Sequence, residues 1–336
     1  MIAATDRRSV RWAWRPARAV LGLAVSGMCL YLALRGVALE EAWRTLRSVA
    51  PLPLAAASMV AIGTLFARGF RWSRLLAPAG TGAWWPLGWS VAIGFAVNNL
   101  LPARAGEVVR SVSAARKLRV GVGTAFGSVV VERAWDLAAA LAVITAGFAA
   151  VGATAGRDAL VREAGGRLGI EVSIPGAAAS MAVAVAGVGA AVLLLAFRSG
   201  TALRLAEQAA SLLPRRWQAR AVSGVRGFAS GLAAAARRDV TAVLVVSLCL
   251  WLAAYASVWL ALTACSVPAS LPAVVLVVTS LVIAVSLPPG PGFIGTYEYM
   301  AASAITASTG VTWERALAAA LVLHLASYVP ITIAGV

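Results

Sequence analysis

The sequence predicts an all-α polytopic membrane protein with about seven transmembrane helices and two re-entrant segments. Three observations lead to this fold class. Of the 336 residues, 61% are hydrophobic and only 12% are charged, and the mean hydropathy is +0.85. Apolar runs of helix length alternate with short loops that are rich in arginine. Two of the apolar runs are broken by proline and glycine, which interrupt a regular helix.

The charge pattern separates this chain from nucleic-acid-binding proteins. Its net charge of +16 comes from 29 basic and 13 acidic residues. The arginines lie in short loops between apolar runs, as the positive-inside rule expects of cytoplasmic loops. We therefore expect the membrane as a partner, and no nucleic acid.

Residues that commonly bind metals are scarce. Cys29, Cys249 and Cys265 lie in or at the end of apolar segments without metal-ligand spacing, and His324 is the only histidine. Cysteines in such positions are usually small packed apolar residues. The sequence thus predicts no metal site, no other cofactor and no soluble catalytic domain.

The first two helices follow from alternating apolar and basic segments. Residues 1–18 form a basic N-terminus that we place in the cytoplasm, and Ala19–Leu34 is the first transmembrane helix. The loop Arg35–Ala50 has nearly balanced charges and suits the outer side, and Pro51–Ala67 crosses back. Three arginines then mark the cytoplasmic side: Arg68, Arg71 and Arg74.

Residues 84–110 contain the first broken segment. Asn98 and Asn99 lie inside an apolar run, and Pro102 follows. Ionisable residues then recur at three-residue spacing, which places them on one side of a helix. They are Arg104, Glu107 and Arg110. Such groups at bilayer depth cost about 3 kcal/mol each and usually serve a function, the alternative being a helix end in the headgroup region.

The charges after this segment favour a re-entrant hairpin. Residues 102–119 carry five basic residues and one acid. If 84–101 crossed the membrane, this basic block would lie outside. If 84–110 dips in and returns, the block stays in the cytoplasm and every later loop fits the positive-inside rule.

A second charged motif lies near the start of the long predicted helix Val120–Val151. Glu132 and Asp136 are four residues apart and share a face, with Arg133 between them. Two carboxylates in lipid need cationic partners, and the nearest in the preceding sequence are Arg104 and Arg110. The alternative is a purely structural ion-pair network.

The middle of the chain continues the alternation. Residues 152–176 suit an outer loop, Ala177–Phe197 crosses back, and 198–239 carries eight arginines and should be cytoplasmic. Residues 198–239 either form amphipathic helices on the anionic leaflet or are a solvated linker. Val240–Ala264 and Leu271–Leu287 then form a hairpin.

The second broken segment covers residues 288–311. It begins with three prolines and three glycines: Pro288, Pro289, Gly290, Pro291, Gly292 and Gly295. A helix should start near Thr296, with Glu298 in its first turn. The positive end of that helix can bind an anion or be satisfied by Glu298 itself.

The last apolar run, Ala316–Val336, places His324 and Tyr328 on one face. A lone histidine is more often packed and hydrogen-bonded than functional. Each half of the chain thus has a helix, a broken segment and a further helix, which suggests an internal repeat of the transporter type.

Three blocks carry a resemblance to a known family. In this order they are NNLLPARAGEVVR, VVVERAWD and LPPGPGFIGTYE. Together with the late His324 and Tyr328, they resemble the lysylphosphatidylglycerol synthase transmembrane (flippase-like) family over most of the chain. The resemblance implies a stand-alone member without the aminoacyl-transfer domain. It also points to a set of site and break residues: Asn99, Pro102, Arg104, Gly106, Glu107, Arg110, Glu132, Arg133, Asp136, Pro291, Gly292, Gly295 and Glu298.

From residues and resemblance together we expect a lipid flippase of the bacterial inner membrane and not an enzyme. It would move an anionic phospholipid or lipid-linked headgroup between leaflets. Arg104, Arg110 and Arg133 would hold a phosphate. The acidic residues would balance these arginines, bind a cationic headgroup or carry protons, and they are Glu107, Glu132, Asp136 and Glu298. His324 completes the candidate binding residues. No phosphate-binding loop for ATP occurs in the chain.

Two other functions remain open from the sequence. The first is an integral-membrane transferase acting on a polyprenyl-phosphate-linked or phospholipid substrate, because paired carboxylates near arginines also suit acid–base chemistry. The second is a membrane partner that regulates a soluble enzyme through 198–239. A second copy of the chain and a lipid-modifying enzyme are the further candidate partners.

Overall fold

The computed structural model describes six stretches of the chain and three isolated positions: residues 7–76, 84–101, 105–154, 215–237, 239–286 and 290–336, and 187, 204 and 208. Helices are the only regular structure in these stretches, which confirms the all-α fold class. Three helices are long and apolar enough to cross a membrane, or four if a helix pair bent by 90° is one span. The count of about seven spans is therefore not confirmed, and Pro102, Arg104, 152–176 and Ala177–Phe197 fall mainly or wholly outside the described residues.

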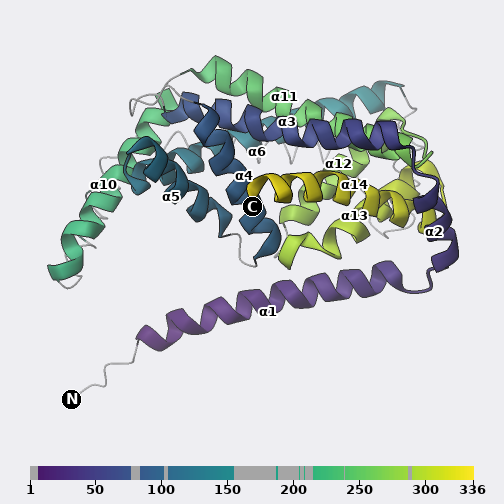
Figure 1. Cartoon of the computed structure of the whole chain (residues 1–336), viewed down its shortest axis with the longest axis horizontal. Helices are drawn as coiled ribbons and strands as arrows, with labels where there is room; N and C mark the ends of the chain where they lie inside the picture. Colours follow the sequence, from purple (N-terminus) through teal and green to yellow (C-terminus); the bar gives the residue numbers. More distant parts are fainter. Residues whose placement is uncertain are drawn as a thin grey trace.

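The described helices keep the order that the sequence predicted (Figure 1). Their bounds are α1 Arg7–Leu34, α2 Leu39–Arg47, α3 Pro51–Leu76, α4 Trp85–Leu100, α5 Gly106–Leu118, α6 Val122–Thr154, α10 Arg215–Arg237, α11 Val240–Ala264, α12 Leu271–Ser286, the short 3₁₀ helix η3 Pro291–Phe293, α13 Thr296–Thr309 and α14 Trp313–Gly335.

One predicted boundary was wrong and another was confirmed. Helix α3 continues nine residues past Ala67, through the arginines that we interpreted as markers of the cytoplasmic side. Arginine is a good helix former, and carboxylates of α6 bind these side chains. The predicted outer loop 35–50 contains the amphipathic helix α2. Helix α13 begins at Thr296, as expected.

The order and lengths of four helices repeat within the chain. Helices α3 to α6 have 26, 16, 13 and 33 residues, and α11 to α14 have 25, 16, 14 and 23. The two first members, α3 and α11, lie side by side (Figure 1). Ala50 N, just before α3, donates to Ala264 O at the end of α11 (2.8 Å), and Arg71 Nη1 near the end of α3 donates to Ser247 Oγ (2.7 Å). Helices α3 and α11 are thus antiparallel, so the two halves run in opposite directions.

Helices α4 and α5 form a tight antiparallel hairpin. Ser90 Oγ lies 3.0 Å from Ser113 Oγ, and Asn98 Oδ1 accepts a hydrogen bond from Gly106 N at 2.8 Å. A Cβ atom on Gly106 would overlap the backbone oxygen of Gly94. The hairpin is a feature of the fold, and its re-entry into a bilayer stays a prediction.

Helices α12 and α13 form the second hairpin, and its tip meets the tip of the first. Tyr328 Oη donates to Asn99 O at 3.0 Å. Gly292, in η3, lies against both residues, because a Cβ there would come within 3.2 Å of Asn99 O and 2.8 Å of the Tyr328 ring. The two breaks, distant in sequence, therefore lie together in the interior.

The last helix of each half packs on the short second helix of the other half. In one contact, Gly335 of α14 lies against Ala92 of α4. In the other, Gly147 of α6 lies against Val275 of α12. At the first crossing glycine lets the backbones approach closely, and at the second it leaves room for the Val275 side chain; small residues are common where membrane helices pack. The halves are thus interlocked and not merely adjacent.

The loops collect at two ends of the bundle. At one end, Thr312 Oγ1 donates to Glu41 Oε1 (2.8 Å) and an Arg315 nitrogen donates to Ser266 O (3.0 Å). At the other end, Arg74 lies 3.7 Å from Asp239. Glu41 and Ser266 come from predicted outer loops, and Arg74 and Asp239 come from predicted cytoplasmic segments, so the two ends keep these predicted sets apart. The predicted re-entrant segment 288–311 had implied that Thr312 and Arg315 lie at the opposite end from Glu41, and the structure places them at the same end. Which end faces the cytoplasm stays a prediction.

Candidate functional site

The breaks and the charged motifs converge on two polar sites inside an otherwise apolar bundle. The larger one, which we call the arginine–carboxylate cluster, draws on α3, α5 and α6. Its members are Arg68, Arg71, Glu107, Arg110, Glu132, Arg133 and Asp136.

Arg71 is the centre of the cluster and is fully buried. One of its terminal nitrogens donates to Glu132 Oε1 at 2.8 Å, and the other donates to Asp136 Oδ1 at 2.6 Å. The spacing of the two carboxylates on α6 matches the planar fork of a guanidinium, which favours this bidentate arrangement. Arg71 thus ties α3 to α6 and, through Ser247, to α11.

Arg110 is the least satisfied member. Its Nε lies 2.7 Å from Glu107 Oε2 and its Nη1 lies 3.0 Å from Glu132 Oε2, while its guanidinium carbon stands 5.0 Å from the Trp72 ring centre. None of its three nitrogens makes a well-directed hydrogen bond within the described stretches, although the side chain is only 2% exposed. Buried N–H groups of a cation are costly to leave unpaired, so this position can accept an additional anionic or polar ligand.

The cluster opens at Arg133, whose side chain is 42% exposed. Arg133 lies 2.7 Å from Glu107 Oε1 and 3.4 Å from Asp136 Oδ2, and Arg68 lies 3.2 Å from the same Asp136 oxygen. With four arginines against three carboxylates, these members carry a net charge of +1. At bilayer depth an excess cation attracts an anion.

Most of this cluster was predicted from the sequence, but its centre was not. Arg110 was predicted as a candidate partner of the α6 carboxylates, and the structure brings it to Glu132. Arg68 and Arg71 were interpreted as markers of the cytoplasmic side and not as members of a site, so their contacts with Glu132 and Asp136 were missed. The three-residue spacing of Arg68, Arg71 and Arg74 at the end of an apolar run was the available signal, because it places them on one helix face.

The second polar site joins Glu298 of α13 to His324 of α14. Glu298 Oε2 accepts a hydrogen bond from Gly295 N at 2.7 Å, and Glu298 Oε1 lies 2.5 Å from His324 Nδ1. The imidazole stacks on Tyr297 at 4.1 Å between ring centres and meets the Tyr328 ring edge-on at 5.3 Å. Glu298 and His324 are both buried. Glu298 thus satisfies the start of its own helix, one of the two alternatives left open by the sequence.

The break before α13 depends on glycine at two positions. Gly292 and Gly295 have φ angles of +62° and +88°, which residues with a Cβ rarely adopt. Gly295 also lies against the backbone of α1, and Gly290 N donates to Ser26 Oγ of α1 at 3.0 Å. Pro291 starts the single 3₁₀ turn. The predicted break residues therefore bring the chain against α1 and direct Glu298 inward.

The paired asparagines have structural partners. Asn99 Nδ2 donates to Thr332 Oγ1 of α14 at 2.7 Å, and Asn98 accepts the hydrogen bond that starts α5. Both residues stabilise the meeting point of the hairpins. Among the described residues, no hydrogen bond joins Asn99 to a charged side chain, so its predicted part in binding has no direct geometric support.

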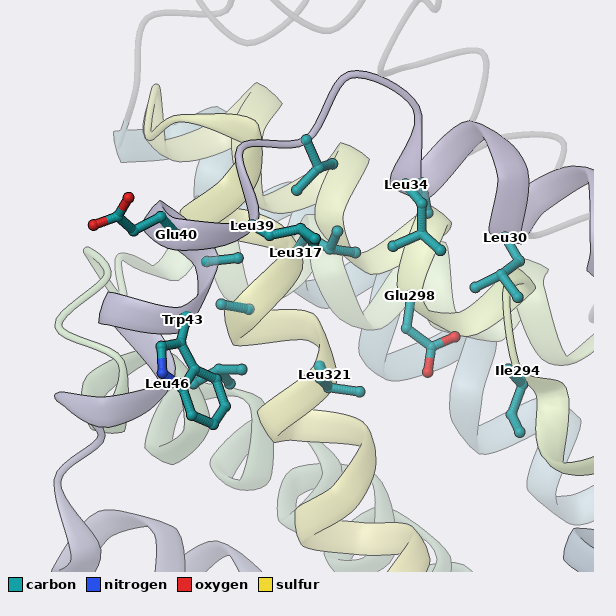
Figure 2. A pocket seen from close by; sticks show the side chains of 14 residues that line it. Leu30, Leu34, Leu39, Glu40, Trp43, Leu46, Ile294, Glu298, Leu317 and Leu321 are labelled. Atoms are coloured by element: carbon teal, nitrogen blue, oxygen red, sulfur yellow. The ribbon is translucent and has the colours of Figure 1, made fainter.

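An apolar groove runs past Glu298. It has a volume of about 580 Å³ and lies between α1, α2, the break and α14 (Figure 2). Leu30, Leu34 and Leu321 form much of its wall, and Glu298 and Glu40 are its only ionisable lining residues. Figure 2 shows the Glu298 carboxylate between the leucines of α1 and α14.

The family model described as the lysylphosphatidylglycerol synthase TM region matches residues 19–335. The chain belongs to this family. No curated protein matches the chain.

The match to the lysylphosphatidylglycerol synthase TM region family extends over both halves of the interlocked bundle. The matched range includes both hairpins, the arginine–carboxylate cluster and the Glu298–His324 pair. The resemblance stated from the three sequence blocks is therefore confirmed. The family description concerns a membrane region.

Proposed function

We propose that this protein moves an anionic phospholipid, or a lipid-linked anionic headgroup, between the leaflets of the bacterial inner membrane. The observation that carries the proposal is the pair of broken hairpins. They come from two inverted halves and meet tip to tip in the interior. Inverted repeats with discontinuous helices around a central site are typical of secondary transporters.

The arginine–carboxylate cluster supplies the chemistry for the anionic headgroup. A phosphate has the bidentate acceptor geometry that guanidinium groups prefer. Arg133 is the most exposed cation of the cluster and Arg110 the least satisfied. A phosphate that approaches from the open side meets Arg133 first.

Glu107 gives the site a way to exchange partners. Its two oxygens bind Arg133 and Arg110, and its side chain is 27% exposed. A phosphate can replace this carboxylate at both arginines, because both ligands offer paired oxygens. Since Glu107 is the second residue of α5, its displacement acts directly on the tip of the first hairpin.

The alternative function, an integral-membrane transferase, has less support from the surroundings of the three carboxylates. A carboxylate that serves as general acid or base must exchange a proton near neutral pH. All three carboxylates of the cluster are instead bound by arginines in this structure. Such pairing stabilises the ionised form and suits electrostatic balance more than acid–base catalysis.

A leaflet assay in proteoliposomes tests the proposal. Fluorescent phosphatidylglycerol is reconstituted with purified protein, and the fraction accessible to an external quencher is followed. We expect the wild type to equilibrate the lipid, and Arg133→Ala and Glu132→Gln to slow this at least tenfold. Arg74→Ala is the matched control, because Arg74 lies on the same bundle but pairs with Asp239 outside the cluster.

The leaflet assay and a deletion strain together distinguish lipid transport from a transferase activity. A wild type without lipid movement would refute the transport proposal. Mass spectrometry of lipids from a deletion strain then gives the second answer. An unmodified precursor together with a missing product would indicate a transferase, and unchanged total composition would agree with transport.

A further inference from the structure

The second polar site occupies the same place in its half as part of the arginine–carboxylate cluster does in the other. Glu107 is the second residue of α5 and Glu298 is the third residue of α13. Arg133, which binds Glu107, is the twelfth residue of α6, counted from Val122. His324, which binds Glu298, is the twelfth residue of α14, counted from Trp313. Each half therefore has a carboxylate at a hairpin tip paired with a cationic side chain on the following long helix.

The two pairs differ in one chemical property. Arginine stays charged at any pH that a cell meets. Histidine changes its charge between pH 5 and 8. The first half therefore has a permanent ion pair where the second half has a pair that can gain or lose one proton.

No other charged group competes with this pair within the described stretches of the chain. Helices α4, α11 and α12, which pack against α13 or α14, contain no charged residue. On α13 and α14 the titratable groups that face the imidazole are the phenols of Tyr297 and Tyr328. On α2, Glu40 lines the same groove but lies at its rim, where it binds Arg44 at 2.9 Å.

The remaining cations of the neighbouring helices point elsewhere. The α3 arginines bind carboxylates of α6 and Asp239. Arg35, directly after α1, lines a neighbouring cavity along the last turns of that helix and is not among the residues that line the groove at Glu298. At the start of α14, Arg315 donates to Ser266 O at the outer end. Among the side chains that the structure describes, the charge of the second site therefore depends on Glu298 and His324 alone.

We propose that the Glu298–His324 pair is a proton-binding site that couples lipid movement to a proton gradient. This inference rests on the transport function proposed above. His324 Nδ1 faces Glu298, and His324 Nε2 makes no hydrogen bond among the described residues, so the proton enters at Nε2. Uptake converts a pair with a net charge of −1 into a neutral ion pair, and release restores the negative charge.

The position of Glu298 explains how this charge acts on the lipid path. Its carboxylate lies in the wall of the apolar groove and also holds Gly295, the hinge of the second hairpin. A net negative charge beside an apolar groove disfavours an apolar chain there, because burial of an unpaired charge is costly. Protonation of His324 neutralises the pair and removes that cost, and Glu298 keeps the hydrogen bond from Gly295 N. Proton binding and occupation of the groove therefore favour one another.

The single histidine allows a direct test of proton binding. In protein purified with a histidine-free tag and labelled with ¹⁵N-histidine, every imidazole signal comes from His324. In phosphatidylglycerol nanodiscs we expect the imidazole signals to report one protonation step as the pH is varied, and we expect Glu298→Gln to change it. A ring without any protonation step, or an identical step in Glu298→Gln, would overturn the proposal without any transport measurement.

A proton gradient across proteoliposomes tests the coupling. If one proton moves per lipid, a difference of one pH unit shifts the steady-state leaflet ratio of fluorescent phosphatidylglycerol about tenfold. We expect this shift in the wild type and in Arg74→Ala, the control whose partner Asp239 lies outside both polar sites and the groove. His324→Arg reproduces the permanent pair of the first half and should show a ratio near one at any gradient.

The outcomes separate the two proposals. Lipid movement without any response to the gradient would refute proton coupling and leave transport intact. A response in His324→Arg equal to that of the wild type would also refute it. Absence of lipid movement at zero gradient would refute the transport proposal itself, and the imidazole titration would still report whether the pair binds a proton.

Discussion

Replacement of Arg71 by methionine tests the centre of the arginine–carboxylate cluster. The variant keeps the length of the side chain and removes its charge, which leaves Glu132 and Asp136 without their shared partner. Breaking a buried ion pair by removing one partner costs about 3–5 kcal/mol. Glu132 keeps Arg110, and Asp136 keeps Arg68 and Arg133. We therefore expect a loss near the lower limit, about 3 kcal/mol.

Thermal unfolding in detergent measures this loss. At about 2 °C per kcal/mol for a chain of this size, the melting temperature should fall by about 6 °C. Arg74→Met is the control, because its partner Asp239 lies 3.7 Å away and both side chains are nearly half exposed. Such a surface pair contributes about 0–1 kcal/mol.

The double variant Arg71→Met, Glu132→Met tests whether the Arg71–Glu132 ion pair is the source of the lost stability. Replacing both members of a buried pair by apolar residues is often nearly neutral. The double variant should therefore be more stable than Arg71→Met alone. If the two single losses simply add, the described pairing is not the source of the effect, and the reasoning fails.

Three further predictions concern the hairpins. Gly106→Ala should lower the melting temperature by several degrees, because its methyl group would overlap the backbone of α4, whereas Gly63→Ala, with open space around it, should leave the temperature unchanged or slightly raised. Tyr328→Phe should lose the hydrogen bond to the tip of the first hairpin, cost about 1 kcal/mol in the same unfolding assay, and alter lipid movement in the leaflet assay. A single cysteine at position 119, in a cysteine-free background, should react with membrane-impermeant reagents only from the cytoplasmic side of oriented membranes. Labelling from outside would contradict re-entry of the first hairpin.

Local features of the fold were predictable from the sequence because short-range physics determines them. Proline, glycine and the apolar runs predicted both breaks and the start of α13 at Thr296. The charge balance of the loops predicted a hairpin at α4 and α5. The end of α3 was not predictable in this way, because an arginine after an apolar run is equally typical of a loop and of a helix that continues.

The partners of the charged residues depended on contacts across the bundle. Arg71 lies 61 residues before Glu132 in the chain, and no local pattern shows that α3 and α6 are adjacent. The pairing of Glu298 with His324 was equally hidden, although both residues were singled out. Periodicity places a residue on a helix face, and only the packing of the helices decides what that face meets.

The interlocking of the halves has a consequence for biosynthesis. The α4 surface is completed by α14, the last helix of the matched region to leave the ribosome. Until Trp313–Gly335 is inserted, the first hairpin keeps one polar tip uncovered, with the Asn99 carbonyl lacking the Tyr328 hydroxyl. The nascent first half must therefore persist in the membrane as an incomplete intermediate, and premature termination before α14 would expose this tip to lipid and to quality-control proteases.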